Sequence, residues 1–186
     1  MLMVSNLAGF GARRASAYIW DPDALFTSGE QGVFFDSSDL STMFQDRAGT
    51  TPVTADGQTV GKILDKSGRG NHATAPNDAA RPLYKTSGGL HWLQFDGVDD
   101  SLSTASFDLS LSTKASLFFG FNKTSDQNPA WLFENIVGNT NGISVAQRGT
   151  GIEIGFKTNA DMNETVSPYS AQQKLVVTAL FDPDNV

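Results

Sequence analysis

Cysteine is absent from the 186-residue chain, and only two histidines, His72 and His91, occur in it. The lack of cysteine excludes disulfides, thiol nucleophiles and thiolate metal sites, so the fold must be stabilised by packing. Neither histidine can be assigned to a nucleophile triad, because the sequence contains no G-x-S-x-G turn. We therefore predict no catalytic residue and no enzyme of these classes.

Basic residues are also scarce, with 13 Lys and Arg against 20 Asp and Glu and a net charge of −7. Apart from Arg13 and Arg14 the basic residues are scattered, whereas binding to a phosphate backbone depends on clustered cations. We expect no nucleic-acid partner. No apolar run approaches the roughly 18 residues of a membrane span, and Met1–Val4 is too short for the apolar region of a secretory signal. We expect neither membrane insertion nor a signal peptide.

Glycine and aromatic residues are plentiful, with 18 Gly and 13 Phe, and this composition is typical of short strands joined by tight turns. In the second half of the chain apolar residues alternate with polar ones, so that one strand face is apolar. The predicted inward sets are Leu117, Phe119 and Phe121; Ile152, Ile154 and Phe156; and Leu175, Val177, Ala179 and Phe181. The pattern predicts an all-β fold, a single antiparallel β-sandwich over residues 17–186.

Two local structures are predicted in the first half. Asp56-Gly57 lies between β-prone residues, which indicates a hairpin over residues 52–60. Ser38 or Asp39 is expected to cap a helical turn over residues 40–44. Residues 1–16 show neither a helical nor a strand periodicity and are interpreted as an N-terminal arm. The arm is either a disordered terminus or an anchor in which Phe10 and the arginine pair dock on a neighbouring subunit.

Two segments resemble a known family. The sequence LDKSGRGNHAT at residues 64–74 resembles the turn near the start of laminin-G-like, concanavalin A-like jelly-roll domains, and LQFDGVDD at residues 93–100 resembles one of their strands. Residues 32–60 are similar to the leader of such domains in bacteriophage and prophage structural proteins. The resemblance covers residues 32–181. It implies a jelly-roll sandwich located in a virion.

The two segments also make physical sense as turns. In the first, Asp65 and Ser67 can bond nearby backbone amides while Gly68 and Gly70 adopt positive φ. In the second, Leu93 and Phe95 are expected to face a core.

The second segment ends in three carboxylates, those of Asp96, Asp99 and Asp100. These could bind Ca²⁺ through oxygen ligands, as the resemblance implies, since many domains of that family bind this ion. The alternative is that Asp96 caps a turn while the other two carboxylates are solvated or bond backbone amides.

Carbohydrate binding would depend on aromatic rings that stack on sugar faces. Trp92 is the first candidate, because it lies on the strand face opposite Leu93; Trp131 and Tyr169 are further candidates. The alternative for Trp92 is that it fills the other side of a two-layer core.

Glycoside hydrolysis is the enzymatic alternative on this fold, but the E-x-D-x-x-E pattern of laminarinase-like relatives is absent from the sequence. The sequence therefore favours a phage or prophage structural module (tail, fibre or capsid decoration) that contacts host surface glycans and other virion proteins, the latter through residues 1–16. A glycan-degrading hydrolase and a purely structural decoration protein remain alternatives.

Residues 174–181 are predicted to form a core strand, after which family members continue with further strands. We therefore expect the sandwich to be incomplete at its C-terminus and the chain alone to be unstable or oligomeric.

Overall fold

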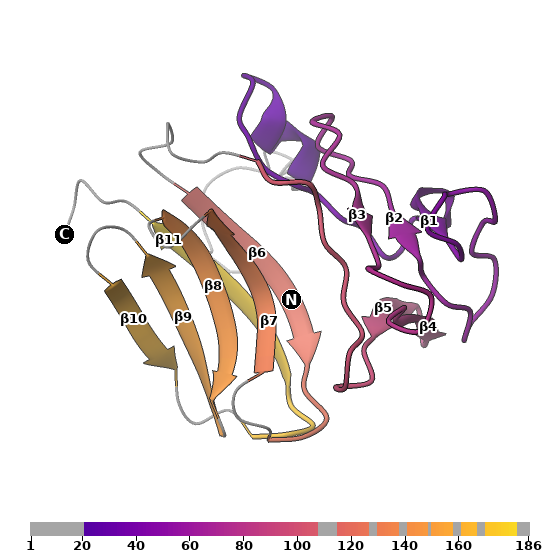
Figure 1. Ribbon diagram of the computed structural model, residues 1–186. Helices are drawn as coiled ribbons and strands as arrows, with labels where there is room; N and C mark the ends of the chain where they lie inside the picture. Colours follow the sequence, from indigo (N-terminus) through magenta and orange to yellow (C-terminus); the bar gives the residue numbers. More distant parts are fainter. Residues whose placement is uncertain are drawn as a thin grey trace, which may run out of the picture.

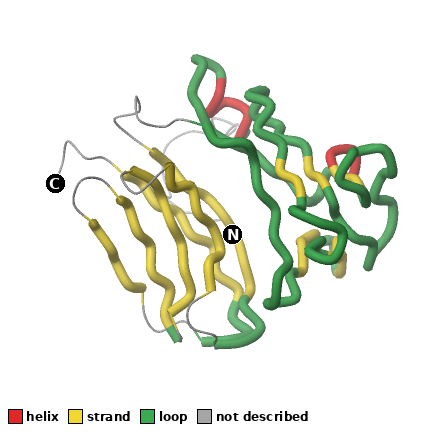
Figure 2. Tube along the Cα trace, in the orientation of Figure 1, coloured by secondary structure: helices red, strands yellow, loops and turns green. Residues whose placement is uncertain are grey.

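The computed structural model of the chain describes residues 21–107, 115–126, 130–137, 141–148, 150–157, 161–166 and 170–181. These residues form eleven β-strands and two short 3-10 helices. Strands dominate the C-terminal half, whereas much of the N-terminal half consists of loops and turns (Figure 2). The prediction of an all-β fold is confirmed. The expected arm at residues 1–16 lies outside the described residues.

The N-terminal half contains five short strands in two small antiparallel sheets. Strands β1, β2 and β3 pair in that order, and β4 and β5 form a hairpin. Their bounds are β1 (Met43–Phe44), β2 (Lys62–Ile63), β3 (Ala73–Thr74), β4 (Leu83–Ser87) and β5 (Leu90–Gln94). A hydrophobic cluster unites the two sheets, with buried Met43, Val53, Val60, Ile63, Ala73 and Tyr84 at its centre.

The C-terminal half contains longer strands, which are drawn side by side in Figure 1. One sheet has the order β10-β9-β8-β7, and a second consists of β11 and β6; all neighbours are antiparallel. The bounds are β6 (Ala115–Asn122), β7 (Ala130–Val137), β8 (Asn141–Arg148), β9 (Gly151–Lys157), β10 (Asp161–Val166) and β11 (Lys174–Phe181). The strand predicted at residues 174–181 is confirmed.

These two sheets share a second hydrophobic cluster. Val145 of β8 and Ile152 of β9 are fully buried, and partly buried apolar side chains of both sheets pack against them. The packed residues are Leu117, Phe119, Phe121, Phe133, Ile154 and Leu175. The period-two prediction for residues 117–121 is therefore confirmed. The residues of the first cluster lie between positions 40 and 102, and those of the second lie between positions 117 and 175.

The two local predictions for the first half are confirmed in part. Asp39 caps a 3-10 helix of only three residues, Leu40–Thr42, by accepting a hydrogen bond from the Ser41 amide. Gly57 turns the chain with a φ of 80°. The residues on either side of that turn do not form a hairpin ladder, however, because Pro52 pairs with Phe44 and Thr59 pairs with Leu83. Pairing with more distant segments of the core replaces the local pairing.

Within the described part of the chain, we found no helix of the length and apolar character needed to cross a bilayer.

Candidate functional site

The loop that follows β2 is organised around the carboxylate of Asp65, a residue that is only 8% exposed. Asp65 Oδ1 accepts from the amides of Phe34 and Ser67, each at 2.9 Å. Its Oδ2 accepts from the Ser67 hydroxyl at 2.7 Å and from the Asn71 amide at 3.0 Å. Burial would raise the pKa of Asp65, but these hydrogen bonds outweigh it and hold the pKa below its usual value. The carboxylate thus stays ionised as the centre of the loop.

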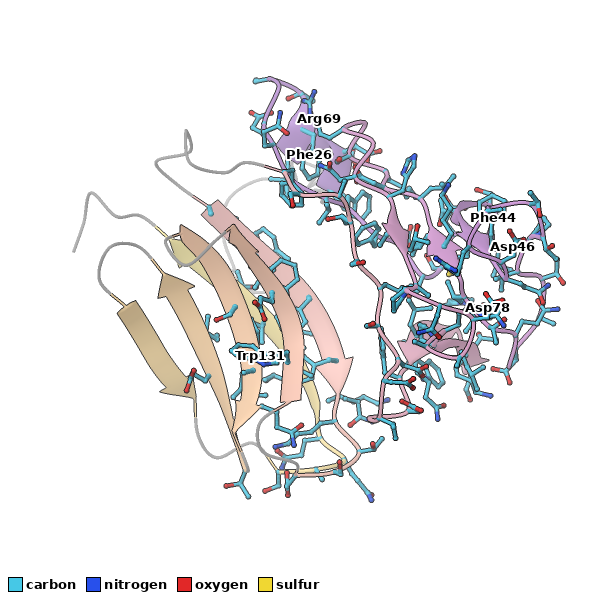
Figure 3. All side chains as sticks on the ribbon, in the orientation of Figure 1. Phe26, Phe44, Asp46, Arg69, Asp78 and Trp131 are labelled. Carbon is cyan, nitrogen blue, oxygen red and sulfur yellow. The ribbon has the colours of Figure 1, made fainter. Side chains whose placement is uncertain are left out.

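The rest of this loop has structural partners as well. Gly68 and Gly70 adopt φ values of 78° and 76°, as predicted for the turn. Arg69 reaches back to the N-terminal segment and donates to the Phe26 carbonyl at 2.8 Å, and the two residues are seen together in Figure 3. His72 Nδ1 accepts from the Asp65 amide at 3.0 Å. The turn at residues 64–74 therefore holds together segments that are distant in sequence.

The hairpin of β4 and β5 presents one face to the core and the other to solvent. Alternation along β5 directs Leu93 to the first cluster, whereas Leu90, Trp92 and Gln94 are exposed. Trp92 is 38% exposed, so it lies on the solvent side and does not fill a second core layer. On the inner side, the hydroxyl of buried Tyr84 and His91 Nδ1 are hydrogen-bonded at 2.7 Å. The outer face of this hairpin is the candidate functional site.

Three side chains, those of Trp92, Lys85 and Asp56, follow one another across this face. Lys85 of β4 lies directly opposite Trp92 of β5 in the strand register. Lys85 Nζ is 2.6 Å from Asp56 Oδ2, and the Thr86 amide donates to Asp56 Oδ1 at 2.8 Å. The hydrogen bond from Lys85 is the main cause that lowers the pKa of Asp56. The tryptophan ring thus lies beside an ordered pair of hydrogen-bonding groups.

The acidic turn, Asp96 to Asp100, begins directly after the hairpin. Asp96 Oδ1 accepts from the amides of Val98 (2.8 Å), Asp99 (3.3 Å) and Asp100 (3.4 Å), while Asp100 Oδ2 accepts from the Asp96 amide at 2.9 Å. The Val98 bond chiefly lowers the pKa of Asp96. Desolvation and the charges of Asp96 and Asp99 raise the pKa of Asp100. The predicted turn cap at Asp96 is confirmed.

The same turn offers a set of oxygen donors to a hard cation. Carboxylate oxygens of Asp96, Asp99 and Asp100 lie within 4.8 Å of one another. Two carboxylate oxygens are engaged by backbone amides, so Asp96 Oδ2, Asp100 Oδ1 and both Asp99 oxygens have no hydrogen-bond donor among the described residues. Ca²⁺ takes six to eight oxygens, so this set fits Ca²⁺ only with further ligands such as water.

The candidate aromatic residues are not brought together. Trp131 is 52% exposed on β7, in the C-terminal half, whereas Trp92 belongs to β5 in the N-terminal half; the two strands lie well apart in Figure 1. A bulge between Trp131 and Phe133 interrupts the pairing of β7 with β8, and Leu132 beside it is also exposed. Tyr169 lies outside the described residues.

One expectation for this region is wrong. Phe95 does not face the core as Leu93 does, because 47% of its side chain is exposed. The reason is that the ladder of β5 ends at Gln94 and the chain then turns through Gly97, whose φ is 77°. Phe95 lies beyond the last strand pair, so the period-two rule no longer determines its direction.

Sequence reasoning missed Asp56 and Lys85 as members of the site. Asp56 belongs to the predicted turn, and it reaches Lys85 across a sequence separation of 29 residues. The available signal was the alternation of β4, in which Lys85 must point away from the core if Tyr84 points into it.

Comparison with known proteins gives no further assignment. No family model matches the chain, and no curated protein and no solved structure shows a significant match to it.

Proposed function

We propose that this chain is a surface module of a bacteriophage or prophage particle that binds host surface glycans through the outer face of the β4–β5 hairpin. The observation that carries the glycan proposal is the exposure of Trp92 beside the ordered Lys85–Asp56 pair. The association with a particle rests on the resemblance of residues 64–74 and 93–100 to phage-borne jelly-roll domains. The location proposed for the protein is accordingly the virion.

The chemistry of this face suits a sugar. The C–H groups of a pyranose face pack on an aromatic ring, and its hydroxyls need donors and acceptors at the ring's edge. Gln94 is the next exposed residue along β5 and offers both a donor and an acceptor. Lys85 and Asp56 supply a second donor and acceptor across the strand pair. An apolar ring between two polar positions can therefore orient a saccharide as well as hold it.

We also propose that the fold is a concanavalin A-like sandwich. The packing of the β7–β10 sheet on β6 and β11 through one hydrophobic cluster supports this proposal, since two antiparallel sheets that share a core form the layers of a sandwich. Ca²⁺ at the acidic turn would belong to the same architecture. Asp96, Asp99 and Asp100 would hold it through their carboxylate oxygens.

Other virion proteins are the proposed macromolecular partners, with residues 1–16 as the anchor and an oligomer or larger assembly as the working state. Deletion of residues 1–16 should leave the melting temperature unchanged and prevent incorporation into particles. Incorporation of the deleted protein at the normal level would refute the anchor. Light scattering on the chain by itself tests the assembly, and a stable monomer would contradict it.

The glycan proposal is tested by retention on host cell-surface polysaccharide, comparing the wild-type protein with Trp92→Ala and with Trp131→Ala as the matched control. Retention should fall at least tenfold for Trp92→Ala. The reason is that stacking of an aromatic ring on a sugar contributes about as much as a well-packed aromatic contact at an interface. Trp131→Ala should leave it unchanged, since that residue lies on another sheet. Shortening of the polymer would instead establish the hydrolase. If the protein is neither retained by the polymer nor shortens it, the structural decoration protein is the remaining candidate.

A further inference from the structure

The charges around Trp92 are unevenly distributed. Lys85 is the cation directly across from Trp92, and its ammonium is bound to Asp56 at 2.6 Å. Beyond Gln94 the chain enters the acidic turn, which brings three carboxylates close together. The row across the hairpin is thus internally neutralised, and the end of β5 is negative. The chain as a whole carries a net charge of −7.

The ammonium of Lys85 is committed to its partner. Asp56 is held by the Thr86 amide as well as by Lys85, so its carboxylate has a fixed position. The bond to Lys85 lowers the pKa of Asp56, which keeps Asp56 ionised at neutral pH. No cation–π contact between Lys85 and Trp92 is found in the described part of the chain. A ligand above the ring therefore meets a cation whose charge is already balanced.

We infer that this face binds uncharged glycans and rejects glycans that carry carboxylate, phosphate or sulfate groups. The inference rests on the proposed function and specifies its ligand class. A neutral saccharide needs only stacking and hydrogen bonds, which Trp92, Gln94 and the Lys85–Asp56 pair offer. An anionic saccharide would have to displace Asp56 from Lys85. A charge of the same sign as an unwanted ligand discriminates against that ligand, because the repulsion weakens its binding.

The acidic turn extends this discrimination along the strand. The ladder of β5 ends at Gln94, two residues beyond Trp92, and the acidic turn begins two residues further on at Asp96. The screening length at physiological ionic strength is about 8 Å. The turn therefore acts on the sugar units that follow the one stacked on Trp92, and its effect depends on salt.

Asp56→Asn is the decisive variant. Asparagine retains an oxygen that can accept from the Thr86 amide, but it removes the charge that balances Lys85. The ammonium then becomes available beside the ring, and binding of anionic glycans should increase by up to about fivefold, the upper end of the range for one exposed ion pair. Asp23→Asn is the matched control, because it removes the same charge from an exposed position in the 3-10 helix Pro22–Phe26.

The measurement is retention of the full chain on two sets of immobilised polysaccharides, neutral ones (dextran, galactan, N-acetylglucosamine oligomers) and anionic ones (polygalacturonate, alginate, heparin). The wild-type and Asp23→Asn proteins should bind at least one neutral polymer and no anionic polymer, and Asp56→Asn should gain anionic binding. A second measurement needs no variant: higher salt should weaken the rejection of anionic polymers by the wild-type protein.

The outcomes separate the two proposals. Anionic binding by the wild-type protein that equals or exceeds neutral binding overturns the charge selection but leaves glycan binding intact. If the rejection of anionic polymers changes neither with salt nor in Asp56→Asn, the charge selection is likewise overturned and glycan binding is left intact. Failure of the wild-type protein to bind any polymer of either set overturns the proposed function, and the inference with it.

Discussion

Replacement of Asp65 tests whether the turn at residues 64–74 holds the N-terminal half together. The Asp65 carboxylate accepts four hydrogen bonds, three of them from the backbone amides of Phe34, Ser67 and Asn71. Asp65→Ala removes every acceptor and leaves these amides without their partner. Hydrogen bonds to a charged group contribute about 1.5–3 kcal/mol each, and partial access of water to the loop recovers some of the loss. We expect the free energy of unfolding to fall by about 3–5 kcal/mol.

Asp65→Asn gives a graded test of the same network. The amide oxygen can still accept from Phe34 and Ser67, but the amide nitrogen would face the Asn71 N–H, so one bond is replaced by two opposed donors. The expected loss is about 1–3 kcal/mol. Asp78→Asn is the control, because the Asp78 side chain is 77% exposed and lies 3.9 Å from Arg81; it should change stability by less than about 0.5 kcal/mol.

Differential scanning calorimetry is the assay. A change of 1 kcal/mol shifts the melting temperature of a chain of this size by about 2–4 °C, so Asp65→Ala should melt roughly 6–20 °C below the wild-type protein. The pKa of Asp65 is lowered in the folded state, so its contribution is complete above the unfolded pKa near 3.9 and is lost as the pH falls through the folded value. The gap between wild type and Asp65→Ala should therefore close in acid. Equal melting of Asp65→Ala and Asp78→Asn at neutral pH would refute the reasoning.

Two further predictions concern packing and the acidic turn. Gly61→Ala should destabilise the protein by about 1–3 kcal/mol in the same calorimetric assay, because its Cβ would lie 2.6 Å from the Asp46 carbonyl carbon and 2.8 Å from the Arg47 nitrogen. Gly120→Ala is its control, since its nearest new contact is 3.8 Å; equal effects of the two substitutions would contradict the steric argument. If the acidic turn binds Ca²⁺, saturation at a hundred times the Kd should add about 2.7 kcal/mol of stability, and Asp99→Asn should reduce this gain. A wild-type melting temperature that stays constant from micromolar to millimolar Ca²⁺ would exclude the ion.

The sequence by itself determined the strands whose residues alternate strictly. Leu117, Phe119 and Phe121 face the second cluster because successive side chains on a strand point to opposite sides, a rule that needs no knowledge of the partner strand. The same rule predicted the opposite faces of Leu93 and Trp92. The loop around Asp65 was also predictable, since its glycines and short polar side chains carry their own turn geometry and local bonds.

Only the tertiary structure decided which segments meet. Phe34 donates to Asp65 across 31 residues, and Asp56 pairs with Lys85 across 29 residues, so no local pattern could reveal either contact. The same is true of residues 52–59, where pairing with Phe44 and Leu83 replaced the expected hairpin. Local propensity limits the conformations that a turn can adopt, but burial of distant apolar residues selects among them. The charge balance beside Trp92 is therefore a property of the fold, although every residue that contributes to it can be read in the sequence.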